Sequence, residues 1–342
     1  MKTMHVAMYY SNDDVRIEEM PIPEINDDEM LVKVKACGIC GSDVMEWYRI
    51  KKAPRVLGHE MTGDVVKTGK NVKKYSVGDR VFVSHHVPCN TCRYCLLGHH
   101  TLCKTLHSTN FYPGGFAEYL RVPSINVDRG VFLLPSEMTY DEGVFIEPLA
   151  CVIRGIRTVG FTPGCSVLII GSGVSGLLYI KLVKALGCGS VFSTDINNYR
   201  LSMAKKMGAD AAIHASENVP DIIKKHNDGN LADLVVVCTG AVSAAKQAFE
   251  SVQPGGAVLL FAPTQPGISI PLPLFDLWNK QVKIVSTYAG APVDIELAIR
   301  LIKSKQVMVK DLITHRFPLK DAAEGFKLVA DAGKSLKVIL YP

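Results

Sequence analysis

Four cysteines in one short loop form the most specific chemical pattern in the chain. They follow one another as C-x2-C-x2-C-x7-C and are Cys89, Cys92, Cys95 and Cys103. Four thiolates at this spacing can close a tetrahedron around a zinc ion. No ligand position is left for water, so we predict a structural zinc site. An iron–sulfur cluster and a set of free buried cysteines are the alternatives, but cysteines spaced so closely favour zinc.

A second set of metal-binding residue types is spread over the first half of the chain. It consists of a cysteine followed by a Ser-Asp pair, a His-Glu pair and a later glutamate, namely Cys40, Ser42, Asp43, His59, Glu60 and Glu147. A cysteine, a histidine and a carboxylate make a zinc site with one position open to water or substrate. Read singly, each residue is equally well a buried or surface residue of no special role. Together they indicate a Lewis acid.

A glycine-rich turn after an apolar run indicates nucleotide binding. The turn consists of Gly171, Ser172, Gly173, Val174, Ser175 and Gly176. The first glycine permits the tight turn, the second admits the pyrophosphate, and the third lets a helix pack on the strand with its N-terminal amides facing the phosphates. The alternative is a similar turn that binds nothing.

An acidic residue lies about 20 residues beyond this turn, where dinucleotide-binding proteins place one. Asp195 ends the next predicted strand, and its carboxylate would accept hydrogen bonds from ribose hydroxyls. A 2′-phosphate about 4 Å away would be disfavoured by roughly 1 to 4 kcal/mol per charge. Arg200 would soften this repulsion without cancelling it. We therefore predict NAD rather than NADP.

The elements that must position these residues are of two kinds. Short β-type runs broken by glycines fill the first half, at 30–35, 64–67 and 79–83. From Ser166 onwards, strands at 167–170, 191–194, 234–238, 257–261 and 283–287 alternate with helices at 177–186, 200–207 and 244–252, with a turn at Gly255 and Gly256. The tail is predicted as helices 293–303 and 321–330 and a strand 336–341. We predict an α/β protein, with a mostly β domain and a doubly wound parallel sheet.

Length and composition exclude several classes of protein. The 342 residues are enough for two domains of about 150 residues each. No apolar run reaches the roughly 18 residues of a membrane span. The net charge of +5 is scattered, so we expect no nucleic-acid partner. The N-terminus lacks a secretory pattern and ten cysteines are present, which favours a reducing cytoplasm.

Taken together, these motifs resemble the medium-chain zinc alcohol dehydrogenase family over nearly the whole chain. The family's motifs appear in order at 38–43 (GICGSD), 58–60 (GHE), 89–103, 114–119 (GGFAEY) and 171–176. Within the family, the Glu-Pro-Leu at 147–149 and the segment 312–319 look like the sorbitol or L-iditol 2-dehydrogenase branch, with threonine dehydrogenase next nearest.

The resemblance implies a catalytic zinc held by three ligands, Cys40, His59 and Glu147, with Glu60 able to approach or exchange with the metal-bound water. Cys151 is a weaker candidate ligand. It further implies a GroES-like catalytic domain over 1–149, a Rossmann NAD-binding domain over 150–286, and a return to the catalytic domain over 287–342. Family members are commonly dimers or tetramers, so we expect a homodimer or homotetramer.

The implied activity is the NAD-linked oxidation of a secondary alcohol of a small polyol to the ketose. In our hypothesis, zinc lowers the pKa of the substrate hydroxyl, Ser42 relays the proton, and a hydride passes to the nicotinamide. Asp43 would fix the tautomer of His59. Many relatives carry a histidine where this chain has Met45, so Ser42 with a water chain, or Glu60, must replace that relay.

Other functions fit parts of this pattern. An L-threonine 3-dehydrogenase or a 2,3-butanediol-type dehydrogenase would use the same zinc and NAD. A zincless, NADPH-dependent enone reductase disagrees with Asp195, and a non-catalytic structural-zinc binding protein disagrees with the intact Cys40, His59 and Glu147. The sequence leaves open the polyol, the carbon that is oxidised and the direction in the cell.

Overall fold

The computed structural model describes residues 2–342, and the chain divides into two compact units. Unit 1 consists of Met1–Ala150 and Gly290–Pro342, and unit 2 consists of Cys151–Ala289. The sequence predicts a first boundary after residue 149 and a second after residue 286, whereas the units change after Ala150 and after Ala289. Helix α6 (Ile146–Val159) contains the first of these changes.

Unit 1 is mostly β structure. Its three-stranded sheet has the order β2-β1-β4, and its seven-stranded sheet has the order β15-β16-β3-β5-β6-β8, with β7 paired to β3. The strands are β1 (Thr3–Ser11), β2 (Asp14–Pro21), β3 (Met30–Ile39), β4 (Arg55–Val56), β5 (Glu60–Thr68), β6 (Arg80–Val83), β7 (Tyr119–Val122), β8 (Val131–Leu133), β15 (Ile313–Pro318) and β16 (Lys337–Tyr341). The helices are α1 (Glu46–Arg49), α2 (Arg93–Leu96), α3 (Lys104–Ser108), α4 (Ser124–Arg129), α5 (Tyr140–Gly143), α12 (Pro292–Lys303) and α13 (Ala322–Asp331).

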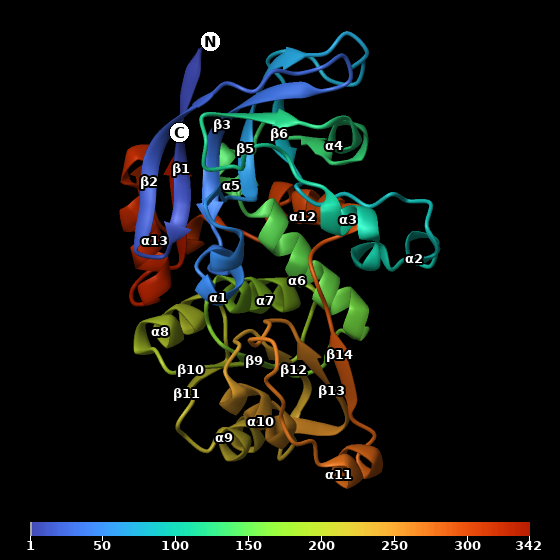
Figure 1. Ribbon diagram of the computed structural model, residues 1–342. Helices are drawn as coiled ribbons and strands as arrows, with labels where there is room; N and C mark the ends of the chain where they lie inside the picture. The colour runs from blue at the N-terminus through green and yellow to red at the C-terminus, as the bar shows by residue number, and fades with distance from the viewer. Residues whose placement is uncertain (1) are drawn as a thin grey trace. The chain divides into compact units, whose positions relative to one another are not determined.

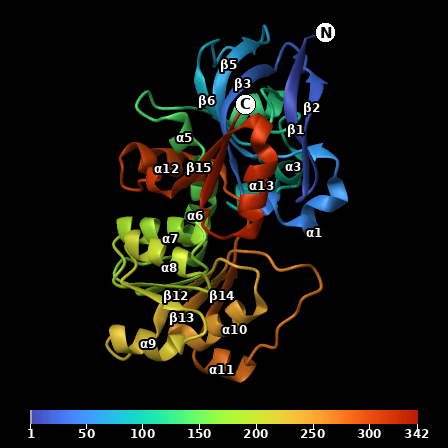
Figure 2. The same ribbon diagram turned by 90° about the vertical axis from the view of Figure 1, so that its left-hand side faces the viewer.

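The C-terminal segment completes the core of unit 1. Strand β16 pairs antiparallel with β3 and parallel with β15, and α13 lies beside β15 in Figure 2. The fully buried ring of Phe326, on α13, packs against Tyr9 and Phe116 at centroid distances of 5.8 and 5.5 Å. The C-terminal segment therefore contributes, between Leu319 and Leu340, to the same hydrophobic core as the first strand.

Unit 2 is a parallel sheet covered by helices on both faces (Figure 1). Its strand order is β11-β10-β9-β12-β13-β14. Successive strands are added on one side of β9 up to β11 and then on its other side from β12 to β14, as in a dinucleotide-binding fold. The strands are β9 (Val167–Ile170), β10 (Val191–Asp195), β11 (Ala211–His214), β12 (Ala232–Val237), β13 (Val252–Leu260) and β14 (Lys283–Ser286). The helices are α7 (Val174–Ala185), α8 (Asn198–Lys206), α9 (Val219–His226), α10 (Val242–Ser251) and α11 (Leu274–Asn279).

These three sheets and the helices around them confirm the predicted α/β fold class. One local prediction is wrong: Gly255 and Gly256 do not separate a helix from a strand, because β13 already begins at Val252. The pairing of β13 with β12 shifts register across this stretch, and Gly255 has a φ of +79°. The glycines therefore accommodate an irregularity within the strand. None of the described helices has the length and apolar character needed to cross a membrane.

Candidate active site

Three predicted metal-binding side chains converge where β3 and β5 meet. The ligand atoms of Cys40, His59 and Glu60 lie within 4.8 Å of one another. Register produces this proximity, because Gly38 of β3 is paired with Glu60 of β5 and Cys40 follows directly after the end of β3. A thiol, an imidazole and a carboxylate at this spacing suit a zinc ion and leave room for a fourth ligand.

Asp43 contacts two members of this group, Cys40 and His59. Its carboxylate is fully buried and accepts hydrogen bonds from the backbone amide of Cys40 at 3.0 Å and from the guanidinium of Arg49 at 3.3 Å. The Nδ1 atom of His59 lies 3.4 Å from Asp43 Oδ1. Burial alone would lower the pKa of His59, but the carboxylate of Asp43 outweighs it and raises that pKa well above its usual value. The Asp43 contact holds the imidazole in one orientation.

Ser42 lies in the short turn between Cys40 and Asp43. Its backbone amide donates to Cys40 Sγ at 3.4 Å, and its hydroxyl oxygen accepts a hydrogen bond from Arg49 at 3.0 Å. Arg49 also bonds the Ser42 carbonyl at 2.8 Å. Arg49 therefore holds the hydroxyl in place, and the Ser42 backbone amide lies next to the thiol. Met45 caps the following helix α1 through its backbone and offers no proton-transferring group.

The carboxylate of Glu60 has a partner that sequence reasoning missed. Lys337, the first residue of β16, donates a hydrogen bond to Glu60 Oε2, and both side chains are almost completely buried. Burial would lower the pKa of Lys337, but the charge of Glu60 raises it above its usual value. The other oxygen, Glu60 Oε1, is buried and has no hydrogen-bond partner within residues 2–342. It is thus available to a cation.

Gly38 is required at this point of the sheet. A Cβ atom there would lie 2.2 Å from Glu60 Oε2 and 2.6 Å from a methyl group of Val144. No side chain fits, so the glycine of the GICGSD motif makes room for the buried carboxylate.

The two predicted carboxylates are not equivalent in the structure. Glu60 is a member of the described metal-binding group, whereas Glu147 and Cys151 are not. Glu147 lies in the first turn of α6, partly exposed, and is close enough for its charge to act on Lys337. The geometry therefore favours Glu60 over Glu147 as the third ligand.

Two histidines that sequence reasoning did not single out, His85 and His86, follow β6 after one intervening residue, Ser84. The ring of His85 lies beside that of His59, with a centroid distance of 5.1 Å, and beside that of His86, with a centroid distance of 3.8 Å and a tilt of 35°. Burial lowers the pKa of His86 to about 3 and lowers that of His85 well below its usual value. Their signal in the sequence is their position at the end of a fully buried strand segment.

The four cysteines of the loop also converge. The ligand atoms of Cys89, Cys92, Cys95 and Cys103 lie within 4.8 Å of one another. Hydrogen bonds from the Thr91 side chain, and from the amides of Thr91 and Cys92, lower the pKa of Cys89 to about 5, whereas burial raises that of Cys95 to about 12. Four thiolates so close together repel one another unless a cation lies between them, and zinc suits four sulfur ligands.

The glycine turn adopts the conformation that nucleotide binding needs. Gly171 follows β9 directly with a φ of +98°, and Gly173 is the N-cap of α7, whose first turn contains Val174 and Ser175. A Cβ on Gly176 would lie 2.0 Å from the Gly171 carbonyl oxygen, whereas one on Gly173 would have only an Arg200 nitrogen, at 3.9 Å, nearby. The backbone is therefore tightly packed at the third glycine, Gly176, and has free space beside the second, Gly173. A pyrophosphate fits there.

Asp195 and Arg200 flank this turn. The carboxylate oxygens of Asp195 accept hydrogen bonds from the amides of Ser172 at 2.7 Å and Asn197 at 2.9 Å. Arg200 lies in the first turn of α8, and its Nε atom is buried with no hydrogen-bond partner in the described part of the chain. The acid is thus fixed next to the turn, and the guanidinium has unused hydrogen-bonding capacity.

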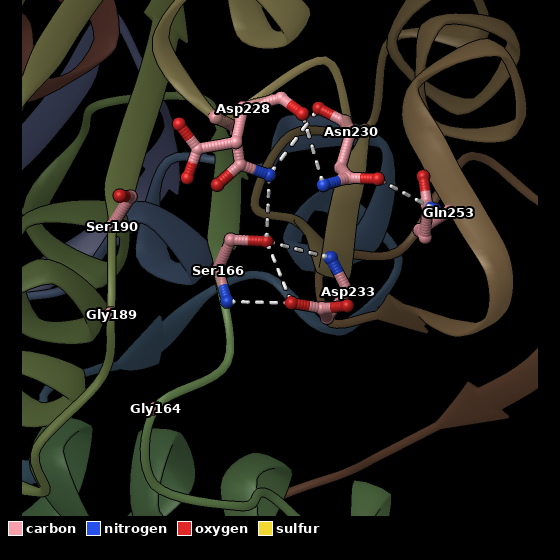
Figure 3. Close-up of a pocket in the computed structure, with 9 residues that line it drawn as sticks. Gly164, Ser166, Gly189, Ser190, Asp228, Asn230, Asp233 and Gln253 are labelled. Carbon is pink, nitrogen blue, oxygen red and sulfur yellow. Dashed lines mark hydrogen bonds between the residues drawn. The ribbon is translucent and has the colours of Figure 1, made fainter.

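A polar cavity of about 470 Å³ lies elsewhere in unit 2 (Figure 3). It is lined by residues at the amino ends of the strands, including Ser166 before β9 and Asp233 in β12, opposite the glycine turn. The polar groups bond one another: Ser166 donates to Asp233 at 2.8 Å, and Asn227 donates to Ser166 at 3.2 Å. Ligands of such sheets bind at the carboxyl ends, so we assign this cavity no role in catalysis.

Comparison with known proteins agrees with this geometry. The profile of the alcohol dehydrogenase GroES-like domain matches residues 26–131, and that of the zinc-binding dehydrogenases matches residues 175–304. Sheep (Ovis aries) sorbitol dehydrogenase is 34% identical over 96% of this chain and 93% of its own. The probable D-xylulose reductase A of Aspergillus fumigatus (strain CBS 144.89 / FGSC A1163 / CEA10) is 34% identical over 95% and 93%.

Among solved structures, galactitol-1-phosphate dehydrogenase from Escherichia coli superimposes with a TM-score of 0.87 at 28% identity and covers 99% of this chain and 100% of its own. These matches confirm the predicted family and show that the protein is an enzyme of the dehydrogenase class. The chain belongs to the medium-chain zinc-dependent alcohol dehydrogenase family, in its sorbitol dehydrogenase-like branch.

Proposed function

We propose that this protein oxidises a secondary alcohol of a small polyol to the ketose, with zinc and NAD as cofactors. The observation that carries the proposal is the convergence of Cys40, His59 and Glu60, with one buried carboxylate oxygen unpartnered. The polyol class is supported by the relatives, which include a sorbitol dehydrogenase and a galactitol-1-phosphate dehydrogenase. The ordered motifs of both units support the cofactors.

When bound, the zinc ion supplies a Lewis acid that lowers the pKa of the substrate hydroxyl, and NAD supplies the hydride acceptor. Cys40, His59 and Glu60 would hold the metal, and Glu147 remains a candidate for its fourth position. The loop cysteines would hold a second zinc, which is structural because four sulfur ligands leave no open position. Gly171, Gly173 and Gly176 would hold the pyrophosphate of the dinucleotide.

The proton leaves through residues of this chain. Ser42 is positioned by Arg49, which donates to its hydroxyl oxygen, so that the hydroxyl can pass a proton from substrate to solvent. Arg49 is a cation and opposes the build-up of positive charge at Ser42, so the hydroxyl does not retain the proton. Asp43 keeps His59 in the tautomer that binds metal. This route does without the histidine that Met45 replaces.

We further propose that two or more copies associate through unit 2, as a homodimer or homotetramer. Strand β14 is the last strand of its sheet, and helix α11 lies near it (Figure 1). No residue of α11 is buried. Leu274, Phe275 and Trp278 are 71%, 72% and 74% exposed, and Ile284 of β14 is 41% exposed. An apolar surface next to a free strand edge favours a protein interface. A second β14, antiparallel and related by a two-fold axis, would cover it.

We also place the enzyme in the cytoplasm. All ten cysteines are free thiols, including the close group in the loop. Thiols that must bind zinc need a reducing compartment.

The proposed activity is tested by zinc content and by turnover of sorbitol, L-iditol, xylitol, L-threonine and 2,3-butanediol with NAD⁺. We expect two zinc ions per chain and the fastest turnover with a polyol. Cys40→Ser should retain one zinc and lose about 10³-fold or more in kcat/KM, since the metal contributes several kcal/mol to the reaction.

The matched control is Cys95→Ser, which removes a thiol from the other group. It should also retain one zinc, but its main defect should be a lower midpoint of thermal unfolding. A wild-type protein with a single zinc, bound by the loop cysteines, and no turnover of any alcohol would contradict the proposed function.

The carboxylate that binds the catalytic metal is identified by comparing Glu60→Gln with Glu147→Gln. We expect Glu60→Gln to lose the catalytic zinc and Glu147→Gln to keep it, because only Glu60 lies in the metal-binding group. Glu60→Gln also leaves Lys337 buried without its anion, so the double variant with Lys337→Met serves as the folded control. The assignment is wrong if Glu147→Gln alone releases the metal.

The choice of NAD over NADP is tested with Asp195→Asn, which removes the charge and keeps the size. The preference for NAD⁺ in kcat/KM should fall by about tenfold or more, because a 2′-phosphate no longer meets a carboxylate. Steady-state kinetics with both cofactors measure the ratio, and Asp210→Asn, at a salt-bridged position away from the turn, is the control. An unchanged ratio of kcat/KM with the two cofactors would show that Asp195 does not determine the choice between NAD and NADP.

Self-association is tested with Trp278→Glu, which places a charge in the exposed apolar surface. Light scattering on a sizing column should give the wild type two or four times the chain mass of 37.3 kDa, and the variant a smaller assembly. Val77→Glu, at an apolar position in unit 1 that is 64% exposed, should leave the mass unchanged. A monomeric wild type would refute this interface.

A further inference from the structure

The segment between Asp43 and His59 carries an excess of positive charge beside the metal-binding group. Its one acidic residue is Glu46, and its basic residues are Arg49, Lys51, Lys52 and Arg55. The two ends of the segment meet, because His59 Nδ1 lies 3.4 Å from Asp43 Oδ1. The segment is therefore a loop that begins and ends at the metal-binding group, and its cations surround the entrance to that group from unit 1.

Contacts with β1 hold this loop in place. Strand β4 pairs antiparallel with β1, with Arg55 opposite the fully buried Tyr9. The Tyr9 hydroxyl donates to Asn12 Oδ1 at 3.0 Å, and the Asn12 side-chain amide donates to the Val44 carbonyl at 2.8 Å. Strand pairing at one end of the loop and a side-chain hydrogen bond at the other give Arg55 a defined place relative to the metal-binding group.

The two arginines of the loop differ in their partners. Arg49 donates to the Ser42 hydroxyl at 3.0 Å and lies 3.3 Å from Asp43 Oδ1. The side chain of Arg55 is partly buried and has no hydrogen bond or ion pair with any residue from 2 to 342. Burial and the nearby charge of Arg49 both lower the pKa of Arg55. A guanidinium keeps its charge in proteins, so this cation lacks a counter-ion.

Arg55 also lies close to the metal-binding group. Its charge acts on His85, whose ring has a centroid distance of 5.1 Å from that of His59. Asp43 is the nearest carboxylate that acts on Arg55, but its oxygens already contact a backbone amide, another guanidinium and an imidazole. Asp43 therefore does not neutralise Arg55, and the partner of this guanidinium must come from outside the chain.

We propose that Arg55 binds an anionic group of the substrate, so that the polyol oxidised by this enzyme carries a carboxylate or a phosphate. This inference rests on the proposed function and narrows it. Both groups present a pair of oxygens to a guanidinium in the geometry that arginine prefers. Lys52, which is exposed and whose Nζ lies 5.6 Å from the centre of the Tyr48 ring, offers a second positive charge. A neutral polyol would leave Arg55 without a counter-ion.

The test compares alcohols that differ in one terminal group. These are D-sorbitol, D-sorbitol 6-phosphate, and L-gulonate and D-gluconate, which carry a carboxylate at opposite ends of the same chain. We expect wild-type kcat/KM to be about tenfold or more higher for at least one anion than for D-sorbitol. In Arg55→Met, kcat/KM for that anion should fall by about 10- to 150-fold, the range for one lost hydrogen bond to a charged group. The value for D-sorbitol should change less than about threefold.

Two further variants separate recognition of the anion from a structural role. Arg55→Lys keeps the positive charge and should recover part of the lost activity. Lys67→Met removes a positive charge from an exposed position near the end of β5 and should behave as wild type on every substrate. Zinc content and the midpoint of thermal unfolding of Arg55→Met should stay at the wild-type values.

The outcomes distinguish this inference from the function on which it rests. Equal losses on D-sorbitol and on the anions in Arg55→Met, or a wild type that prefers the neutral polyol to every anion, would overturn the inference alone. A preference for the phosphate or for a carboxylate identifies which anionic group is bound. A wild type that turns over no alcohol, neutral or charged, would overturn the proposed function and this inference with it.

Discussion

The buried ion pair between Glu60 and Lys337 is the constraint on which the catalytic site depends. Both side chains are almost completely excluded from water, although they are 277 residues apart in the sequence. Removing a carboxylate or an ammonium group from water costs several kcal/mol per ion, so neither is tolerated alone in this place. The chain must therefore bring β16 to β3 before Glu60 can occupy its buried position. This explains why the C-terminal segment belongs to unit 1.

The same pair also orients the carboxylate of Glu60, which we predict to bind metal. Lys337 donates to Oε2 of Glu60, and Oε1 stays buried without a hydrogen-bond partner among the described residues, in a carboxylate whose ligand atom lies within 4.8 Å of those of Cys40 and His59. The absence of a side chain at Gly38 makes this arrangement possible, because any Cβ there would collide with the carboxylate. In the same way, Asp43 fixes the orientation of the His59 ring. Each ligand is thus held by a buried charge of opposite sign or by a hydrogen bond, and the protein itself supplies most of the geometry of the site.

Local patterns in the sequence were sufficient for much of this description. The loop cysteines and the glycine turn lie within 15 and 6 consecutive residues, so their spacing alone predicts which atoms meet. The fold class follows from the alternation of strands and helices in unit 2. Lys337 was beyond such reasoning, because its partner is set by strand pairing across the whole chain. Its one signal is that it interrupts a continuous apolar run, from Leu336 to Leu340, in a strand buried on both faces.

For a related reason, spacing alone leaves the choice between Glu60 and Glu147 open. Spacing shows that a carboxylate is available, but the register of β3 with β5 decides which one reaches the thiol, and register is a property of the folded sheet. His85 was missed because an isolated histidine after a strand is usually structural, and only its ring contact with His59 gives it significance.

The two predicted zinc sites differ in what holds them together. Around the catalytic group, Asp43 and Lys337 fix the ligands within the core of unit 1, so the site is formed before a metal arrives. The loop has a much smaller core, in which Leu106 is the one fully buried side chain apart from the cysteines, while Leu96 and Leu97 are 75% and 61% exposed. So little apolar burial cannot offset the conformational entropy of ordering the loop. We therefore expect a zinc ion in the loop to supply folding energy and a zinc ion in the catalytic group to supply chemistry.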